Sequence, residues 1–205
     1  MSRFRQLPRS FYRRGAELVA SDLLGRFLVR RWGRRRLVLK IVETEAYLGA
    51  EDRASHAWGG RRTRRTHNLF RAGGCAYVYF VYGMYHCLNA VTGGPDDGSA
   101  VLIRAGEAID GVPTMRGNRG LGSEPGPGEL AGGPAKLCQA LAIDLRLNGA
   151  PLDRGELRIT TGEPAMPAEI VTGPRIGVAY AGEAAAWPLR FACRGHRDVS
   201  RPHPW

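Results

Sequence analysis

The stretch RFLVRRWGRRRLVLKIVETEAYL, residues 26–48, gives the clearest indication of the fold. Two runs rich in Leu, Val and Ile flank a Trp-Gly-Arg break at residues 32–34. Apolar runs on both sides of a glycine-containing break are typical of two antiparallel strands joined by a tight turn. The stretch therefore predicts a β-hairpin, and with it a sheet.

The second run ends in two glutamates. If residues 37–47 form a regular strand, odd-numbered side chains share a face, so Glu43, Glu45 and Tyr47 continue the apolar face that reaches Ile41. In one interpretation the strand emerges into solvent after Ile41 and the acids are solvated. In the other, burial desolvates them and one acts as a general base. The pattern does not choose between Glu43 and Glu45.

Further elements follow from local patterns. Residues 10–24 carry apolar side chains at helical spacing and predict a helix. Two β-rich runs within 76–91 meet at a Tyr-Gly-Met turn, residues 82–84. A loop rich in Gly and Pro, residues 117–134, precedes a short helix that begins at Pro134. Apolar runs bounded by Gly and Pro predict more strands at 99–105, 156–161, 168–173, 175–180 and 188–195. This order predicts an α+β fold with a mainly antiparallel sheet.

The length of the chain suits one domain with a full core, because 205 residues bury most of their extended surface on folding. No repeat or long linker divides the sequence, so we expect a single domain over 1–205, with loose termini at 1–10 and 196–205. The four cysteines form no C-x-x-C pair, which argues against a zinc site or a disulfide framework and favours a reducing compartment.

The charge of the chain points to nucleic acid as its partner. The formal net charge is +11, and of the 30 lysines and arginines only Lys40 and Lys136 are lysines. The planar guanidinium fork of arginine suits phosphate recognition. Scarce lysine also leaves few candidates for a Schiff-base nucleophile.

The N-terminal stretch has basic residues but no apolar segment of a signal peptide, and no run approaches the roughly 18 apolar residues of a membrane span. We therefore expect a cytoplasmic, nucleoid-associated protein with no membrane partner. The abundance of Ala, Arg and Gly favours a bacterial source with a GC-rich genome.

Two stretches have the chemistry of a DNA-binding surface. Tyr82 and Met84 flank the glycine of the predicted turn, where bulky side chains face outward and resemble wedges that enter a base stack. We expect Tyr77, earlier on the same strand, to be a core residue. The arginine-dense loop 59–65 is a candidate phosphate clamp, and the helix start around Lys136 is a second, weaker candidate.

Four motifs carry a resemblance to a known family: KIVETEAYLGAEDRASHAWGG, YVYFVYGMYHCLN, VLIRA and GGPAKLCQALAID. In this order, between Gly15 and Gly195, they are similar to the alkyladenine DNA glycosylases, also called 3-methyladenine DNA glycosylases of the alkyladenine type. The resemblance implies one compact α+β domain with a curved, mainly antiparallel sheet, surrounding helices and a protruding β-hairpin.

The resemblance also implies an activity. Such an enzyme is a monofunctional DNA glycosylase of base excision repair that acts on double-stranded DNA as a monomer. It flips alkylated or deaminated purines, such as 3-methyladenine, 7-methylguanine, ethenoadenine and hypoxanthine, out of the duplex. It then hydrolyses the N-glycosidic bond with a Glu-activated water, using neither a metal nor an organic cofactor.

Matching positions assign roles to individual residues. The resemblance implies catalysis by Glu45, which activates water, and Arg104, which lies near the phosphate and that water. Glu43 is then structural. It implies a base pocket of Tyr47, His56, Tyr79 and Asn89, a DNA wedge of Tyr82 and Met84, and DNA contacts by Arg61, Thr63, Arg65 and Lys136. The sequence departs from the family pattern at Arg64, where a proline is common, and at His86, where another aromatic is common.

Two other functions compete with this one. A non-enzymatic nucleic-acid-binding module would explain the charge and the aromatic hairpin, but not a glutamate beside a tyrosine and histidine pocket. A bifunctional glycosylase that also cleaves the strand would need Lys40 or Lys136 as its nucleophile.

Overall fold

The computed structural model describes residues 4–204, and its centre is a sheet of eight strands. All pairings are antiparallel, in the order β3-β4-β5-β2-β1-β6, with β8 pairing to β2 and β7 to β8. The strands are β1 Phe27–Trp32, β2 Arg35–Tyr47, β3 Ala76–Val81, β4 Tyr85–Val91, β5 Ala100–Asp110, β6 Leu157–Thr160, β7 Ile170–Gly173 and β8 Arg190–Cys193. The α+β class and the antiparallel sheet are confirmed.

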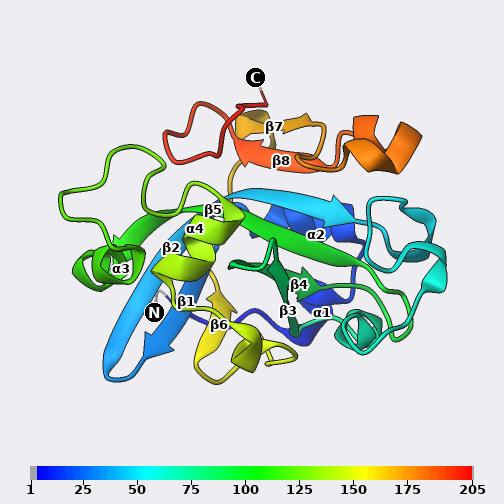
Figure 1. Cartoon of the computed structure of the whole chain (residues 1–205), viewed down its shortest axis with the longest axis horizontal. Helices are drawn as coiled ribbons and strands as arrows, with labels where there is room; N and C mark the ends of the chain where they lie inside the picture. Colours follow the sequence, from blue (N-terminus) through cyan, green and yellow to red (C-terminus); the bar gives the residue numbers. More distant parts are fainter. Residues whose placement is uncertain (1–3, 205) are drawn as a thin grey trace.

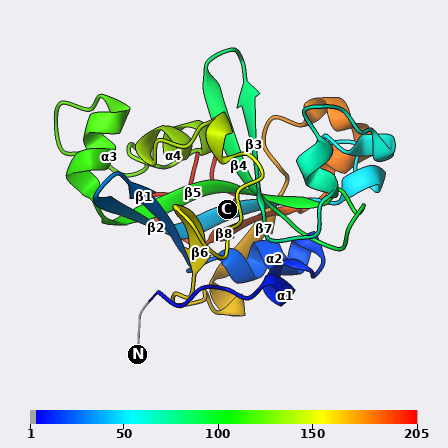
Figure 2. The same ribbon diagram turned by 90° about the horizontal axis from the view of Figure 1, so that it is seen from below.

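Short helices cover both faces of this sheet. The α-helices are α1 Arg9–Tyr12, α2 Ala16–Leu23, α3 Val112–Arg119 and α4 Pro134–Ala140. The 3-10 helices are η1 Gly49–Glu51, η2 Trp58–Gly60, η3 His67–Phe70, η4 Leu145–Leu147, η5 Pro167–Glu169 and η6 Ala179–Ala186. Figure 1 shows the sheet face-on, and Figure 2 shows α2 on one side of it with α3, α4 and the β3–β4 hairpin on the other.

The core joins these layers. One apolar cluster includes Val19 and Leu23 of α2, Ile41 of β2, Ile103 of β5 and Leu137 of α4. Packing of this kind removes apolar surface from water at about 25 cal/mol per Å² and holds the central strands in place. The central strands β2 and β5 are therefore rigid supports for any site built on them.

The two predicted hairpins are present. Trp32 pairs with Arg35 across the first turn, and Val81 pairs with Tyr85 across the second. At the second tip Tyr82 and Met84 are 82% and 62% exposed, as expected for outward-facing residues. Figure 2 shows that this hairpin protrudes from the body of the molecule.

Two predicted elements were wrong. The helix expected at 10–24 is broken into α1 and α2, because the N–H of Gly93 bonds the carbonyls of Tyr12 and Arg14 and diverts the chain there. The strand expected at 175–180 is a bend leading into η6. The N–H of Ile176 donates to the Glu45 carboxylate instead of joining a strand ladder.

The loose termini expected at 1–10 and 196–205 are described only in part, because residues 1–3 and 205 lie outside the described residues. Within the described part, both ends of the chain include buried residues. Leu7 is buried, and its N–H donates to the carbonyl of Ile159. Val199 and Ser200 are buried as well. Within residues 4–204, no helix is both long and apolar enough to cross a membrane.

Candidate active site

Both glutamates of β2 lie in the interior. Glu43 and Glu45 have 0% exposure, so the interpretation as a solvated strand end is excluded. Strict alternation of side chains along residues 37–47 requires a regular strand. β2 is not regular, because its pairing register with β5 shifts on either side of Glu43. Ala46 consequently belongs to the same apolar cluster as Ile41, while the two carboxylates meet polar partners.

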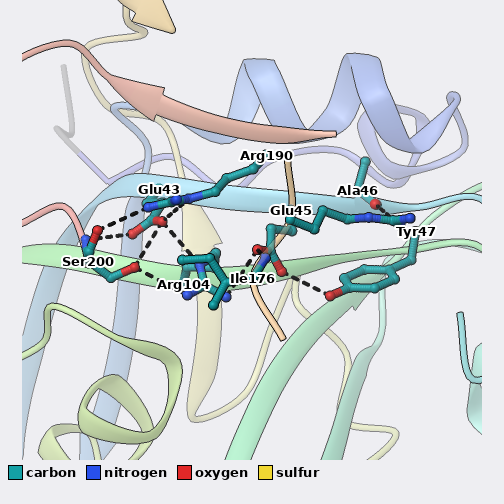
Figure 3. A network of polar contacts seen from close by, with 9 residues as sticks. Glu43, Glu45, Ala46, Tyr47, Arg104, Ile176, Arg190 and Ser200 are labelled. Atoms are coloured by element: carbon teal, nitrogen blue, oxygen red, sulfur yellow. Dashed lines mark hydrogen bonds and ion pairs between the residues drawn. The ribbon is translucent and has the colours of Figure 1, made fainter. Parts of the chain in front are cut away.

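Glu43 is surrounded by donors from β5, β8 and the C-terminal segment (Figure 3). Its Oε1 accepts hydrogen bonds from Arg190 Nε at 2.6 Å, Ser200 Oγ at 2.9 Å and Arg104 Nε at 3.0 Å. Its Oε2 accepts from the backbone N–H of Ser200 at 2.8 Å. A buried charge needs such partners, and the four donors satisfy the Glu43 carboxylate.

Glu45 meets a different set (Figure 3). The hydroxyl of Tyr47 donates to Oε2 at 2.9 Å, and the N–H of Ile176 donates to Oε1 at 2.8 Å. Arg104 Nη1 forms an ion pair with Oε1 at 3.1 Å. Every neighbour is a donor, which is the environment of an ionised, acceptor-only carboxylate.

Arg104 of β5 connects the two acids. Its guanidinium is buried, which opposes the charge, but Glu45 and Glu43 more than offset this and raise the pKa of Arg104. Its Nη2 also donates to Ser200 Oγ at 3.2 Å. Arg104 therefore stays charged and is held in one orientation by three side chains.

A cavity of about 400 Å³ lies above this network. Such a volume is in the range of small-molecule sites. Seven residues singled out from the sequence line it: Tyr47, His56, Arg65, Tyr79, Tyr82, Asn89 and Arg104. Glu45 has no exposed surface and reaches the cavity through Tyr47 and Arg104, which touch both.

Aromatic rings form one wall of the cavity. The ring centroids of His56 and Tyr79 are 4.6 Å apart in a T-shaped arrangement. His56 faces the open cavity, yet its ring packs on Tyr79, and desolvation together with the charge of Arg65 lowers the pKa of His56 to about 4. Burial and the charge of Glu45 raise the pKa of Tyr47 well above its ordinary value. The imidazole and the phenol are therefore neutral near pH 7.

Sequence patterns missed the place of Tyr77 and Tyr180 in this wall, whereas the family resemblance had assigned Asn89 to it. Tyr77 is buried as expected of a core residue, but its hydroxyl also lies 3.0 Å from His56 Nδ1. Asn89, opposite Tyr77 on β4, donates to its carbonyl at 3.2 Å. Tyr180 of η6 lines the cavity mouth with Tyr82. No local signal marks Tyr180, since it lies in the stretch that resembled a strand.

A buried ion pair supports the Tyr47 side of the cavity. Arg175 and Asp52 have fully buried side chains, and Arg175 Nη2 donates to Asp52 Oδ1 at 2.8 Å. The guanidinium also lies 4.7 Å from the ring centroid of Tyr47, and its Nη1 donates to the carbonyl of Ala46. Neither residue stood out in the sequence, because each belongs to a stretch far from its partner.

The arginine-dense loop lies beside the cavity. Arg65 lines it, with its guanidinium 5.3 Å from the Tyr79 ring centroid. Arg61 lines an adjoining groove, and Thr63 is held by hydrogen bonds to Thr66. Arg64, the departure from the family pattern, is exposed on the same loop.

The remaining candidates lie outside the cavity wall. Met84 is at the hairpin tip, and Lys136 donates from Nζ to the carbonyl of Gly128 at 3.1 Å. Lys40 lies in a different groove, so neither lysine lines the cavity beside Glu45 and Arg104. His86 packs against Phe80 with ring centroids 5.0 Å apart, so an aromatic contact is kept at that position.

Comparison with known proteins agrees with this architecture. The model of the methylpurine-DNA glycosylase family matches residues 10–197. A protein of Methanocella arvoryzae is 48% identical over 97% of this chain and 97% of its own length. Proteins of Clostridium beijerinckii, at 44% identity over 95% and 98%, and Myxococcus xanthus, at 43% over 97% and 95%, are similar too. All three are provisionally named 3-methyladenine DNA glycosylases. The resemblance found in the sequence motifs is thus confirmed, and the chain belongs to the methylpurine-DNA glycosylase family, a family of hydrolases that cleave N-glycosyl bonds in DNA.

Proposed function

We propose that this DNA glycosylase removes alkylated or deaminated purines, including 3-methyladenine, 7-methylguanine, ethenoadenine and hypoxanthine, from duplex DNA. The observation that carries the proposal is the set of hydrogen-bond donors around Glu45, which lies directly behind Tyr47 and Arg104 in the wall of a cavity lined by aromatic side chains. Such walls can stack on the face of a purine. In this proposal the sugar of that nucleotide lies against Tyr47 and Arg104, the two cavity residues that contact Glu45.

The reaction follows from the chemistry of the lesion. A purine alkylated at N3 or N7 is cationic and leaves readily, so the sugar develops oxocarbenium character as the bond lengthens. Glu45 stabilises that charge and accepts a proton from the attacking water, a contribution of about 10²- to 10⁴-fold for a general base. A neutral purine such as ethenoadenine or hypoxanthine also takes up a proton, supplied by solvent, as it leaves. Arg104, fixed between Glu43 and Glu45, orients the water and the adjacent phosphate.

Extrusion of the nucleotide is assigned to the β3–β4 hairpin. Tyr82 fills the space left in the duplex and Met84 lies beside it in the minor groove. Flipping costs a few kcal/mol, and the cost is smallest at damaged or mispaired bases, which favours them over intact purines. Asn89, buried in the cavity wall, screens purines by their exocyclic groups.

The protein then holds the duplex through Arg61, Thr63, Arg65 and Lys136, and acts as a monomer. This proposal places it in a bacterial cytoplasm, in association with the nucleoid. The high net charge supports binding to DNA and association with the nucleoid. Relatives from bacteria support a bacterial source.

Base release under single-turnover conditions tests the function. Duplexes carrying one 3-methyladenine analogue, ethenoadenine or hypoxanthine should lose the free base and keep an intact abasic strand. Tight binding of these duplexes without release would favour the binding-module alternative. Strand cleavage with a borohydride-trapped covalent complex would favour a lysine-dependent, bifunctional enzyme.

A further inference from the structure

A second groove opens next to the base cavity and shares part of its wall. Its volume is about 470 Å³, and it is lined by Arg53, Ser55, His56, Trp58, Arg61 and Tyr180. Ser55, His56 and Tyr180 also line the base cavity. The two spaces are therefore neighbours separated by the His56 side chain.

The groove is formed by segments far apart in the chain. Residues 49–70 and η6 lie side by side in both views of the molecule (Figures 1 and 2). The hydroxyl of Tyr180 donates to the carbonyl of Ala54 at 3.2 Å, which ties η6 to this loop. The groove is thus part of the folded framework, and both of its sides are held in place.

The chemistry of the groove is that of a nucleotide site. Trp58 is 48% exposed and Tyr180 is 64% exposed, although both are large aromatic residues. Arg53 and Arg61 are exposed, and within residues 4–204 neither guanidinium has an ion-pair partner. Exposed aromatic rings beside unpaired arginines bind bases by stacking and phosphates by charge.

The position of the groove identifies which nucleotide it would hold. Tyr180 and Tyr82 both line the mouth of the base cavity, and Tyr82 is the residue expected to enter the duplex. A nucleotide flipped into the cavity keeps its covalent links to both neighbours, so the damaged strand must pass over this mouth. The groove lies directly beside that path.

We propose that this groove binds the nucleotide next to the flipped one on the damaged strand. Its phosphate lies between Arg53 and Arg61, and its sugar or base lies against Trp58 and Tyr180. The proposal rests on the proposed function, since it assumes that a nucleotide enters the base cavity. It adds Arg53, Trp58 and Tyr180 to the DNA-binding surface.

Binding to a duplex with a stable abasic analogue tests this subsite without any chemistry. Arg53→Gln should reduce the slope of log affinity against log salt by about one. Replacing one phosphate next to the analogue by a neutral methylphosphonate should weaken DNA binding by the wild type at one position of the replacement. At that position it should not weaken DNA binding by Arg53→Gln any further. Trp58→Ala should weaken binding roughly 5- to 100-fold, and Trp58→Phe should restore most of it.

Arg34→Gln is the matched control, because Arg34 is an exposed arginine at the β1–β2 turn. That turn is at the far end of β2 from Tyr47, about 40 Å along the strand at roughly 3.3 Å per residue. Equal effects of Arg53→Gln and Arg34→Gln, with unchanged methylphosphonate sensitivity, would overturn the proposal. Normal binding without base release by the wild type would instead refute the proposed function.

Discussion

Glu43 and Glu45 are two positions apart on one strand, yet their environments differ completely. Glu43 is fixed by Ser200, 157 residues away, and Glu45 by Ile176, 131 residues away. The sequence alone left open whether the two acids are solvated or buried, and it did not show which of them would act as a base. Partners so distant in sequence leave no local pattern, so only the family resemblance assigned different roles to the two glutamates.

The imidazole of His56 gives a test at the same scale. Its pKa of about 4 lies below the value of about 6.5 for an unfolded chain. Between these values the unfolded chain binds a proton that the folded chain does not, so stability falls as pH decreases from about 6.5 to about 4. NMR titration of the His56 ring should show a midpoint near pH 4.

A midpoint near 6.5 would show that the ring is solvated and not packed on Tyr79. His56→Asn is the control, because it removes both the resonance and its share of the pH dependence of stability. The accompanying base-release rate should be lower in that variant, since one wall of the cavity is lost.

At the scale of elements, what could be predicted depended on where each signal lies. Both hairpins were correct because the turn and its flanking strands are neighbours in the chain. The prediction of one long helix at 10–24 was wrong. The N–H of Gly93, from a distant loop, donates to the carbonyls of Tyr12 and Arg14, which a continuous helix would use for its own hydrogen bonds. The prediction of a strand at 175–180 was wrong because the N–H of Ile176 donates to the Glu45 carboxylate and not to a neighbouring strand.

The tip of the β3–β4 hairpin has a strained backbone at Tyr82. Tyr82 has φ +54°, in the left-handed region where a bulky residue costs roughly 1 kcal/mol. Tyr82→Asn should therefore raise the free energy of unfolding by about 0.5–1 kcal/mol, since Asn tolerates this conformation. The same variant should slow base release, because the wedge is gone. Chemical denaturation and single-turnover kinetics measure the two effects.

Met84→Ala serves as the control, because Met84 is exposed at the same tip and is not among the residues with positive φ. It should leave stability nearly unchanged. A Tyr82→Asn variant that is less stable than the wild type, or that releases base at the wild-type rate, would contradict this account of the hairpin.

The C-terminal segment positions Arg104 through Ser200. The Ser200 hydroxyl donates to Glu43 and accepts from Arg104, while the Ser200 backbone holds Glu43 and Arg190. Ser200→Ala removes only the hydroxyl contacts, so we expect a loss of about 1–3 kcal/mol in stability and slower base release with unchanged binding of abasic DNA.

Ser99→Ala is a matched deletion at another buried serine, bonded to Asp97 outside this network. It should lower stability without a specific effect on the single-turnover rate. Equal rates in the Ser200→Ala and Ser99→Ala variants would show that the C-terminal contact is structural only.

For the whole molecule, charge was the most informative property of the sequence. A net charge of +11, nearly all from arginine, predicted a nucleic-acid partner without indicating which face binds it. The structure gathers Arg61 and Arg65 beside the cavity mouth, through folding of the loop 59–65 that composition could not foresee.

DNA affinity should therefore fall steeply with salt. Three cationic phosphate contacts, from Arg61, Arg65 and Lys136, at about 0.9 each, give a slope of roughly −3 for log affinity against log salt concentration. Fluorescence anisotropy with an abasic-analogue duplex between low and physiological salt measures it. Affinity that does not depend on salt would contradict a phosphate-binding surface.

The central claim is that Glu45 performs the chemistry and Glu43 does not. The direct measurement is the single-turnover rate of base release from an ethenoadenine duplex by the wild type, Glu45→Gln and Glu43→Gln. Binding of an abasic-analogue duplex and thermal unfolding establish that each variant is folded. The account predicts a loss of about 10²-fold or more for Glu45→Gln with binding retained, and a smaller kinetic loss with lower stability for Glu43→Gln. Wild-type rates in Glu45→Gln would contradict it.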